Sequence, residues 1–133
     1  MDTDHRKLHV ECAVDCGNAP KKELLKEFTI AIFQNNKKFC LEWITDDIVW
    51  DIIGYQCFKG KNEWLAAFRQ TNQLDVQELH IHNIITHGNV ASLNGTLILD
   101  EGQKIAFCDV YRFSSFGKKA KIKTVTSYVI PVP

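Results

Sequence analysis

The second half of the chain consists of long segments in which apolar and polar residues alternate, separated by short polar turns. A period of two is typical of β-strands that bury one face. The glycine-containing turns at residues 87–89 and 100–102 favour hairpins between consecutive strands. We therefore expect strands over residues 76–86, 90–99, 104–113 and 120–130, with Pro131 ending the last one.

The first half shows a different period, because its apolar residues recur at spacings of three and four. Leu24, Leu25, Phe28, Ala31 and Ile32 would form one buried helix face. We expect helices over residues 21–34, 37–44 and 63–71. Asn18 and Asn62 are suited to cap the first and third of these, and Pro20 is tolerated in a first turn.

Two further strands are expected in the first half of the chain. Residues 48–53 indicate a buried strand, placed between a turn at 45–47 and a loop at 54–60. Residues 7–14 also alternate, which predicts an edge strand or a loosely docked arm.

Together these elements predict an α+β domain with three N-terminal helices packed in a strongly bent, mostly antiparallel sheet. Residues 1–18 would be an N-terminal arm or edge strand, and residues 19–133 a single domain. Apolar residues remain on the second face of the sheet, which predicts a homodimer through that face.

Composition excludes several classes of function. The 133 residues are 45% hydrophobic and carry a formal net charge of zero, so a nucleic-acid surface or a polybasic membrane patch is not expected. Neither an apolar run long enough to span a membrane nor a signal core is present. Five cysteines without framework spacing fit a reducing compartment, so we expect a cytoplasmic protein, and nothing in the sequence implies a cofactor.

Two aspartates, Asp51 and Asp109, lie inside apolar strand segments. On a strand, Phe107, Asp109 and Tyr111 share one face, so Asp109 is not expected to be freely solvated. Burial raises the pKa of a carboxyl group and produces a general base or a neutral hydrogen-bond donor. The alternatives for each aspartate are an ion pair or hydrogen bonds to backbone N–H groups at a strand end.

Several segments of the sequence resemble the nuclear transport factor 2-like superfamily, which includes SnoaL-like proteins and steroid delta-isomerases. The resemblance extends over residues 24–130 and is carried by residues 46–51 (DDIVWD), Gly54, 60–63 (GKNE), 66–68 (AAF), 108–113 (CDVYRF) and 121–123 (KIK). It implies a cystatin-like cone, in which a bent sheet wraps around the first helix and encloses a pocket, and it implies a homodimer.

The resemblance to the steroid isomerases also implies roles for particular residues. Asp51 corresponds to the base that moves a proton, and Asp109 to the acid that donates a hydrogen bond to the oxyanion. Phe28 stands where the isomerases have a helical tyrosine, and it has no hydroxyl to complete the oxyanion hole. Tyr55 or Tyr111 could supply that hydroxyl, but the sequence places neither.

Strand alternation and the resemblance together predict the residues that line the pocket. They are Phe28, Ile32, Trp50, Tyr55, Phe68, Phe107, Tyr111, Val125 and Ser127. Such an aromatic lining suits a small, largely apolar ligand. Alternatively, these aromatic side chains fill the core and leave no cavity.

Two groups of residues could in principle bind a metal ion, but for each we favour a role that does not involve metal. His80 and His82 share a strand face and such a pair can chelate a metal, but exposed sheet histidines, or ones bonded at the dimer face, are favoured. The set His5, His9, Cys12 and Cys16 does not have the spacing of a standard zinc finger. The other cysteines, Cys40, Cys57 and Cys108, are interpreted mainly as small hydrophobic residues.

Three hypotheses for the function remain. The first is an isomerase, cyclase or dehydratase that uses Asp51 and Asp109 in acid–base chemistry. The second is a non-catalytic ligand-binding or dimerisation module, and the third, with the least support, is a protein-interaction adaptor. The first requires both aspartates to face one cavity.

Overall fold

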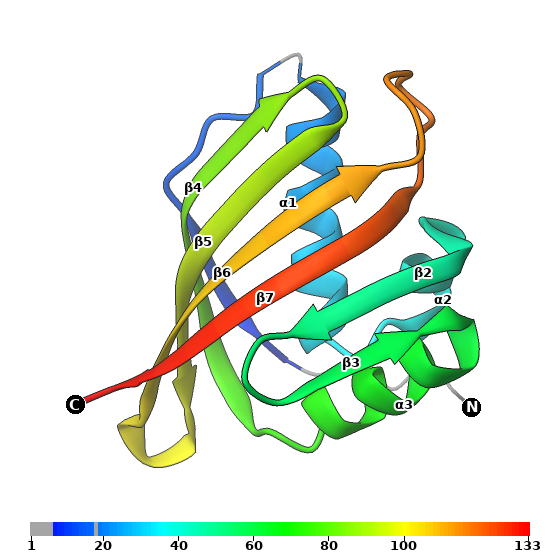
Figure 1. Cartoon of the computed structure of the whole chain (residues 1–133). Coiled ribbons are helices and arrows are strands. Elements are labelled where there is room, and N and C mark those ends of the chain that lie inside the picture. The colour runs from blue at the N-terminus through cyan, green and yellow to red at the C-terminus, as the bar shows by residue number, and fades with distance from the viewer. Residues whose placement is uncertain (1–6, 18) are drawn as a thin grey trace.

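The computed structural model describes residues 7–17 and 19–133, in which helices pack against one side of a curved sheet (Figure 1). The helices are α1 (Pro20–Phe33), α2 (Lys37–Glu42) and α3 (Gly60–Thr71). The strands are β1 (His9–Cys12), β2 (Ile44–Ile52), β3 (Gln56–Lys59), β4 (Val76–His87), β5 (Val90–Leu99), β6 (Lys104–Phe113) and β7 (Ile122–Val132), and a 3-10 turn at Asp100–Gly102 joins β5 to β6.

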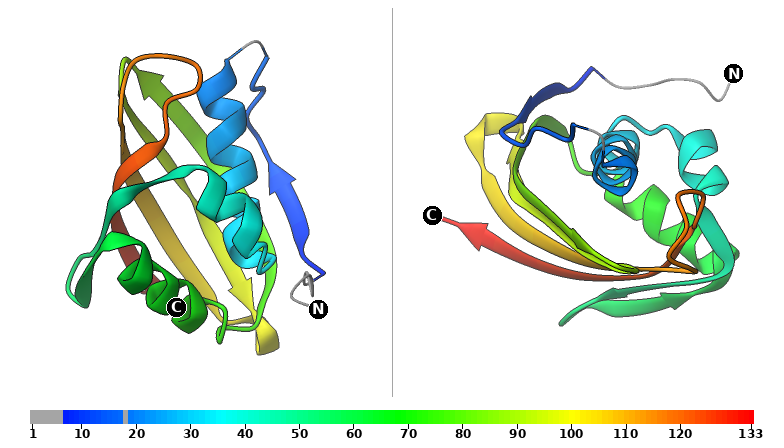
Figure 2. Two further views of the ribbon diagram at one scale, coloured as in Figure 1. Left: turned by 90° about the vertical axis from the view of Figure 1, so that its right-hand side faces the viewer. Right: turned by 90° about the horizontal axis from the view of Figure 1, so that it is seen from above.

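The described residues form one seven-stranded sheet with the order β1-β4-β5-β6-β7-β2-β3. Strand β1 pairs with β4 in parallel, and β2 pairs with β7 in parallel, whereas the other neighbours are antiparallel. The α+β class is confirmed, and the sheet is mixed. Figure 2 shows, from above, that the sheet curves around α1 and leaves its other face uncovered.

The core lies between the concave face of the sheet and the helices. The predicted apolar face of α1 is confirmed, because Leu24, Leu25, Phe28, Ala31 and Ile32 are all buried. Helix α3 contributes Trp64 and Phe68, whose rings stack with centroids 5.3 Å apart. Burying one such large side chain stabilises the fold by roughly 1.5–3 kcal/mol, so this packing determines where the helices sit.

The order of the elements differs from three helices followed by a sheet. Strand β1 precedes α1, and the hairpin of β2 and β3 separates α2 from α3. The predicted turn at residues 45–47 belongs to β2, where the pairing with β7 changes register between Ile44 and Val49. The predicted loop at residues 54–60 contains β3, a strand too short to show a clear alternation.

The helix starts also differ in part from the expectation. Helix α3 begins at Gly60, so Asn62 lies inside its first turn, and the Glu63 carboxylate accepts a hydrogen bond of 2.7 Å from the Lys59 backbone N–H. Pro20 occupies the first turn of α1, as predicted. The expected cap residue Asn18 lies outside the described residues.

Pro131 does not end the last strand, which continues to Val132. Proline cannot donate a ladder hydrogen bond and is tolerated mainly at sheet edges. The pairing between β2 and β7 ends at Ile52 and Ser127, so the stretch that contains Pro131 has β6 on one side and no paired strand on the other. The proline is therefore accommodated without loss of a ladder bond.

A bulge helps to bend the sheet. The register between β4 and β5 shifts between Ile81 and Asn83, so one extra residue is present on β4, which increases local bending. Gly95 lies opposite, and a Cβ at this position would collide with the His80 carbonyl oxygen and approach the Phe107 ring to 3.1 Å. The bend therefore requires the missing side chain of glycine.

Candidate functional site

A cavity of about 400 Å³ opens between the concave face of the sheet and helices α1 and α3. Its wall is predominantly apolar, with aromatic side chains from α1, β2, α3 and β6. Its lining residues are Phe28, Thr29, Ile32, Phe33, Trp50, Ile52, Ile53, Gly54, Tyr55, Trp64, Thr71, Leu74, Leu97, Ile105, Phe107, Asp109, Tyr111, Val125, Ser127 and Val129. Concave apolar sites of this size are typical of small-molecule binding.

The structure brings most of the predicted lining residues together. The cavity wall includes Phe28, Ile32, Trp50, Tyr55, Phe107, Tyr111, Val125 and Ser127. Phe68 is not part of this wall, because its ring is buried against Trp64 in the core. Tyr55 lies at the rim, where it is 66% exposed and its hydroxyl donates a hydrogen bond of 2.9 Å to the Gln70 side-chain oxygen.

Asp109 is the carboxylate of the cavity wall and accepts hydrogen bonds from two side chains, one of which is itself held by a third. The Ser127 hydroxyl donates to its Oδ1 over 2.6 Å, and the Tyr111 hydroxyl donates to its Oδ2 over 3.3 Å. The Trp50 indole N–H in turn donates to the Ser127 oxygen over 2.9 Å. These bonds follow from the register, because Ser127 pairs with Asp109 across β6 and β7.

The environment of Asp109 shifts its pKa. Burial raises the pKa of this carboxyl from 3.8 to about 6, although the hydrogen bonds from Ser127 and Tyr111 act in the opposite direction. The side chain is partly accessible and lines the cavity. Burial and the neighbouring carboxylate also raise the pKa of Tyr111, so its hydroxyl remains protonated and can donate.

Asp51 does not meet Asp109 in the cavity, and the prediction that both aspartates face one hollow was wrong. Its strand neighbours Trp50 and Ile52 line the cavity, so Asp51 lies on the opposite face of β2. In the sheet its register partners are Cys57 on β3 and Thr126 on β7. The two-carboxylate mechanism that the isomerase resemblance implied is therefore not assembled.

Some lining residues were missed although the pattern could have found them. Ile105 lies two positions before Phe107 on β6, and Val129 lies two positions after Ser127 on β7, so both share the inner face. Trp64 on α3 and Leu74 in the loop after it could not be found in this way, because they reach the cavity through the packing of α3 against the sheet.

The histidines and cysteines considered as metal ligands in the sequence have other neighbours in the described part of the chain. The His82 ring bonds the Thr96 hydroxyl, whereas the His80 ring bonds Glu78. His9 is exposed, and Cys12 lies on the other side of β1, where it packs against the core. His5 lies outside the described residues.

The cysteines of the described part of the chain form no disulfide. Burial raises the pKa of Cys16, Cys40 and Cys108, which disfavours the reactive thiolate. None of the helices in the described part of the chain has the length and apolarity that crossing a bilayer requires.

No protein-family model and no curated protein sequence matches the chain. Solved structures do. A nuclear transport factor 2-like protein of unknown function from Cytophaga hutchinsonii is 26% identical, with a TM-score of 0.63 over 82% of this chain and 98% of that chain.

Two further structures share the fold at lower identity. A proposed SnoaL-like polyketide cyclase from Shewanella denitrificans is 9% identical, with a TM-score of 0.71 over 86% of this chain and 92% of that chain. An LEH-like epoxide hydrolase from M. tuberculosis is 18% identical, with a TM-score of 0.66 over 84% of this chain and 79% of that chain. The chain, whose bent sheet curves around helix α1 beside an apolar cavity, is a member of the nuclear transport factor 2-like superfamily.

Proposed function

We propose that the chain binds a small, largely apolar molecule in the cavity and that Asp109 receives the single polar group of this ligand. The supporting observation is the position of Asp109, an ionisable carboxylate on the wall of an otherwise predominantly apolar cavity of about 400 Å³. A site of this kind gains affinity from the apolar wall and orientation from the carboxylate.

The protonation state of Asp109 determines which polar group it accepts. An ionised carboxylate only accepts hydrogen bonds, and Ser127 and Tyr111 occupy part of its capacity. Its remaining lone pairs suit a ligand hydroxyl or N–H. The protonated carboxyl can instead donate to a carbonyl, and a pKa of about 6 makes both forms available near neutral pH.

Binding can be tested with two matched bicyclic ligands, 2-naphthol and its methyl ether, in calorimetric titrations at pH 8. The naphthol donates a hydrogen bond and the ether cannot. Because a hydrogen bond to a charged group contributes about 1.5–3 kcal/mol, we expect the naphthol to bind at least about tenfold more tightly.

The variant Asp109→Asn should lose most of this preference, because a neutral amide accepts a weaker hydrogen bond than a carboxylate. The matched control is Asp51→Asn, which makes the same change on the opposite face of the sheet and should keep it. Failure of both ligands to bind, or an unchanged preference in Asp109→Asn, would rule out the proposed role of Asp109.

A second candidate is an acid–base enzyme that uses Asp109 alone. The favouring observation is the pKa of about 6 beside the protonated Tyr111 hydroxyl, since a general base works best when its pKa is near the working pH. In this reaction Asp109 takes a proton from carbon next to a ligand carbonyl and returns it.

The enzyme hypothesis is tested by following hydrogen–deuterium exchange of 2-tetralone in D₂O by NMR. We expect exchange above the buffer rate that increases as the pH rises through about 6, because only the ionised carboxylate accepts a proton. Asp109→Asn should abolish it and Asp51→Asn should not. Exchange at the buffer rate contradicts catalysis on this ketone.

We also propose that the chain forms a homodimer through the outer face of the sheet. Val110, Tyr128 and Ile130 are exposed there, and Ile130 is 64% exposed. Light scattering after size exclusion should give twice the mass of one chain, and Ile130→Glu should shift it to a single chain. A monomer at all concentrations would refute this.

A further inference from the structure

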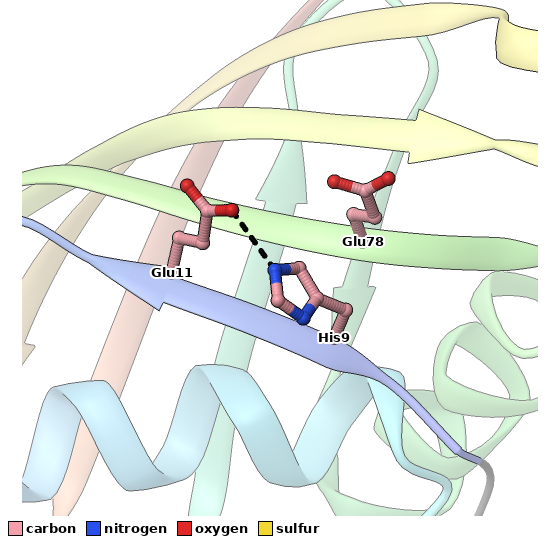
Figure 3. Close-up of side chains that lie close together, drawn as sticks. All are labelled: His9, Glu11 and Glu78. Atoms are coloured by element: carbon pink, nitrogen blue, oxygen red, sulfur yellow. Dashed lines mark hydrogen bonds and ion pairs between the residues drawn. The ribbon is translucent and has the colours of Figure 1, made fainter.

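A group of histidine and glutamate side chains lies outside the cavity wall, on the outer side of β1 and β4. These strands are parallel, and their register places His9 opposite Glu78 and Glu11 opposite His80. Alternate residues of a strand point to the same side, so all four side chains share one face. Figure 3 shows His9 and Glu11 in contact on β1, with Glu78 beside them on β4.

The distances in this group are those of potential metal ligands. One ligand atom from each of His9, Glu11 and Glu78 lies within 4.8 Å of the others. The His9 Nε2 atom lies 2.9 Å from a Glu11 oxygen. Small rotations of exposed side chains can bring such atoms to the distances of about 2.0–2.2 Å that zinc requires.

His80 lies between the two carboxylates and contacts both. Its Nε2 atom lies 2.8 Å from a Glu78 oxygen, and its Nδ1 atom lies 3.5 Å from a Glu11 oxygen. Hydrogen bonds from a neighbouring group to metal-binding carboxylates fix their orientation. His80 is half-buried, with 26% of its side chain exposed, whereas 60% of the His9 side chain is exposed. The group thus has an anchored side and an open side through which an ion can enter.

We propose that His9, Glu11 and Glu78 bind one divalent transition-metal ion such as Zn²⁺, with His80 as the positioning residue for the two carboxylates. One imidazole nitrogen and two carboxylate oxygens leave a fourth tetrahedral position for water. The imidazole favours zinc and its neighbours over magnesium or calcium, which prefer oxygen ligands.

The bound ion would link the N-terminal strand to the sheet. Strand β1 has only four residues and lies at the sheet edge, so it is paired with a strand on one side only. The ligands of the ion come from β1 and from β4, which are far apart in the sequence, so binding requires the two strands to be paired. Zinc should therefore slow the opening of β1 from the sheet without altering the cavity.

The test titrates tag-free, full-length protein with zinc in competition with a chromophoric chelator. We expect one ion per chain, and His9→Ala and Glu78→Gln should each weaken binding at least about tenfold because each removes a ligand. Two controls should bind as the parent does: His82→Ala, the next histidine on β4, and Cys12→Ser, on the inner side of β1. Absence of binding, or equal binding by all variants, would overturn the proposal.

Two further measurements test the roles of β1 and His80. Amide hydrogen exchange in residues 9–12 should slow when zinc is added, and His9→Ala should show no such slowing. His80→Leu should weaken zinc binding about tenfold or more, as loss of a supporting hydrogen bond does, and His80→Gln, which can still donate, should restore part of it. Unchanged exchange in β1, or equal affinity in His80→Leu and the parent, would contradict these roles.

Discussion

Asp51 and Asp109 lie in similar sequence environments on two strands, but they face opposite sides of one sheet. Asp109 points into the cavity between Phe107 and Tyr111, and burial raises its pKa to about 6. Asp51 has Trp50 and Ile52 as neighbours, and these two side chains, not Asp51, point into the cavity. A carboxylate inside an apolar segment therefore becomes a candidate functional group only when its face is the concave one.

The difference has a cause that can be traced to the two strands. In β6 the large apolar residues Phe107 and Tyr111 share a face with Asp109. In β2 apolar residues occupy both faces, because Val49 lies on the same face as Asp51, whereas Trp50 and Ile52 lie on the other. Only the pairing of β2 with β3 and β7 decides which set faces the helices. Substitutions on the concave face should therefore change stability and its pH dependence more than substitutions on the outer face.

The largest effect is expected from Asp109→Asn. The folded-state pKa of Asp109 is about 6 and its usual value is 3.8, so ionisation of this carboxyl lowers the free energy of unfolding. The whole reduction is present above about pH 6, and it disappears below about pH 4. We expect the variant to gain at most about 3 kcal/mol in unfolding free energy at pH 8 and to match the parent near pH 4. Urea unfolding at several pH values measures the difference, and a gain that does not depend on pH would refute the assigned burial.

Gly95→Ala tests the bend that makes one face concave. The added Cβ collides with the His80 carbonyl oxygen, so either the strand or the bulge must move. Such overpacking typically costs about 1–3 kcal/mol, which thermal unfolding can detect. The control is Gly102→Ala, in the turn after β5, where a Cβ meets no atom within 4 Å and only the backbone at φ 82° is strained. Equal losses in the two variants would show that the bend does not require Gly95.

Ser127→Ala should have a smaller effect, with a distinct signature. It removes the donor to Asp109 and leaves the Trp50 indole N–H without its acceptor, so stability at pH 8 should fall by about 1 kcal/mol. The pKa of Asp109 should rise above its present value, because the lost hydrogen bond favoured the ionised form. NMR titration of the Asp109 carboxyl carbon measures this shift. Ser92→Ala, on the outer face of β5, should leave that titration unchanged.

Asp51→Asn should have the smallest effect, because its carboxylate lies on the outer face of the sheet. We expect a change within about 0.5 kcal/mol at any pH between 4 and 8, as is usual for surface substitutions. The same urea series that tests Asp109→Asn measures it. A pH-dependent gain like that of Asp109→Asn would erase the distinction between the two aspartates.

Much of the architecture follows from the sequence, because it depends on local periodicity. The apolar face of α1 and the bounds of β5 and β6 are confirmed as predicted, since each pattern is long enough to be unambiguous. The shared face of Phe107, Asp109 and Tyr111 is likewise local. The hairpin strand β3 was missed because its four residues are too few to show a period.

The tertiary structure alone determined the rest of the candidate sites. Only the structure shows that the Tyr111 hydroxyl bonds Asp109, that Asp51 lies on the outer face of the sheet, and that His9 and Glu11 lie beside Glu78. The physical reason is that hydrogen bonds between distant strands set which residues are neighbours, and a strand with apolar residues on both faces does not reveal which one it buries. The sequence determined the strands and their periods, whereas the pairing of those strands determined the chemistry.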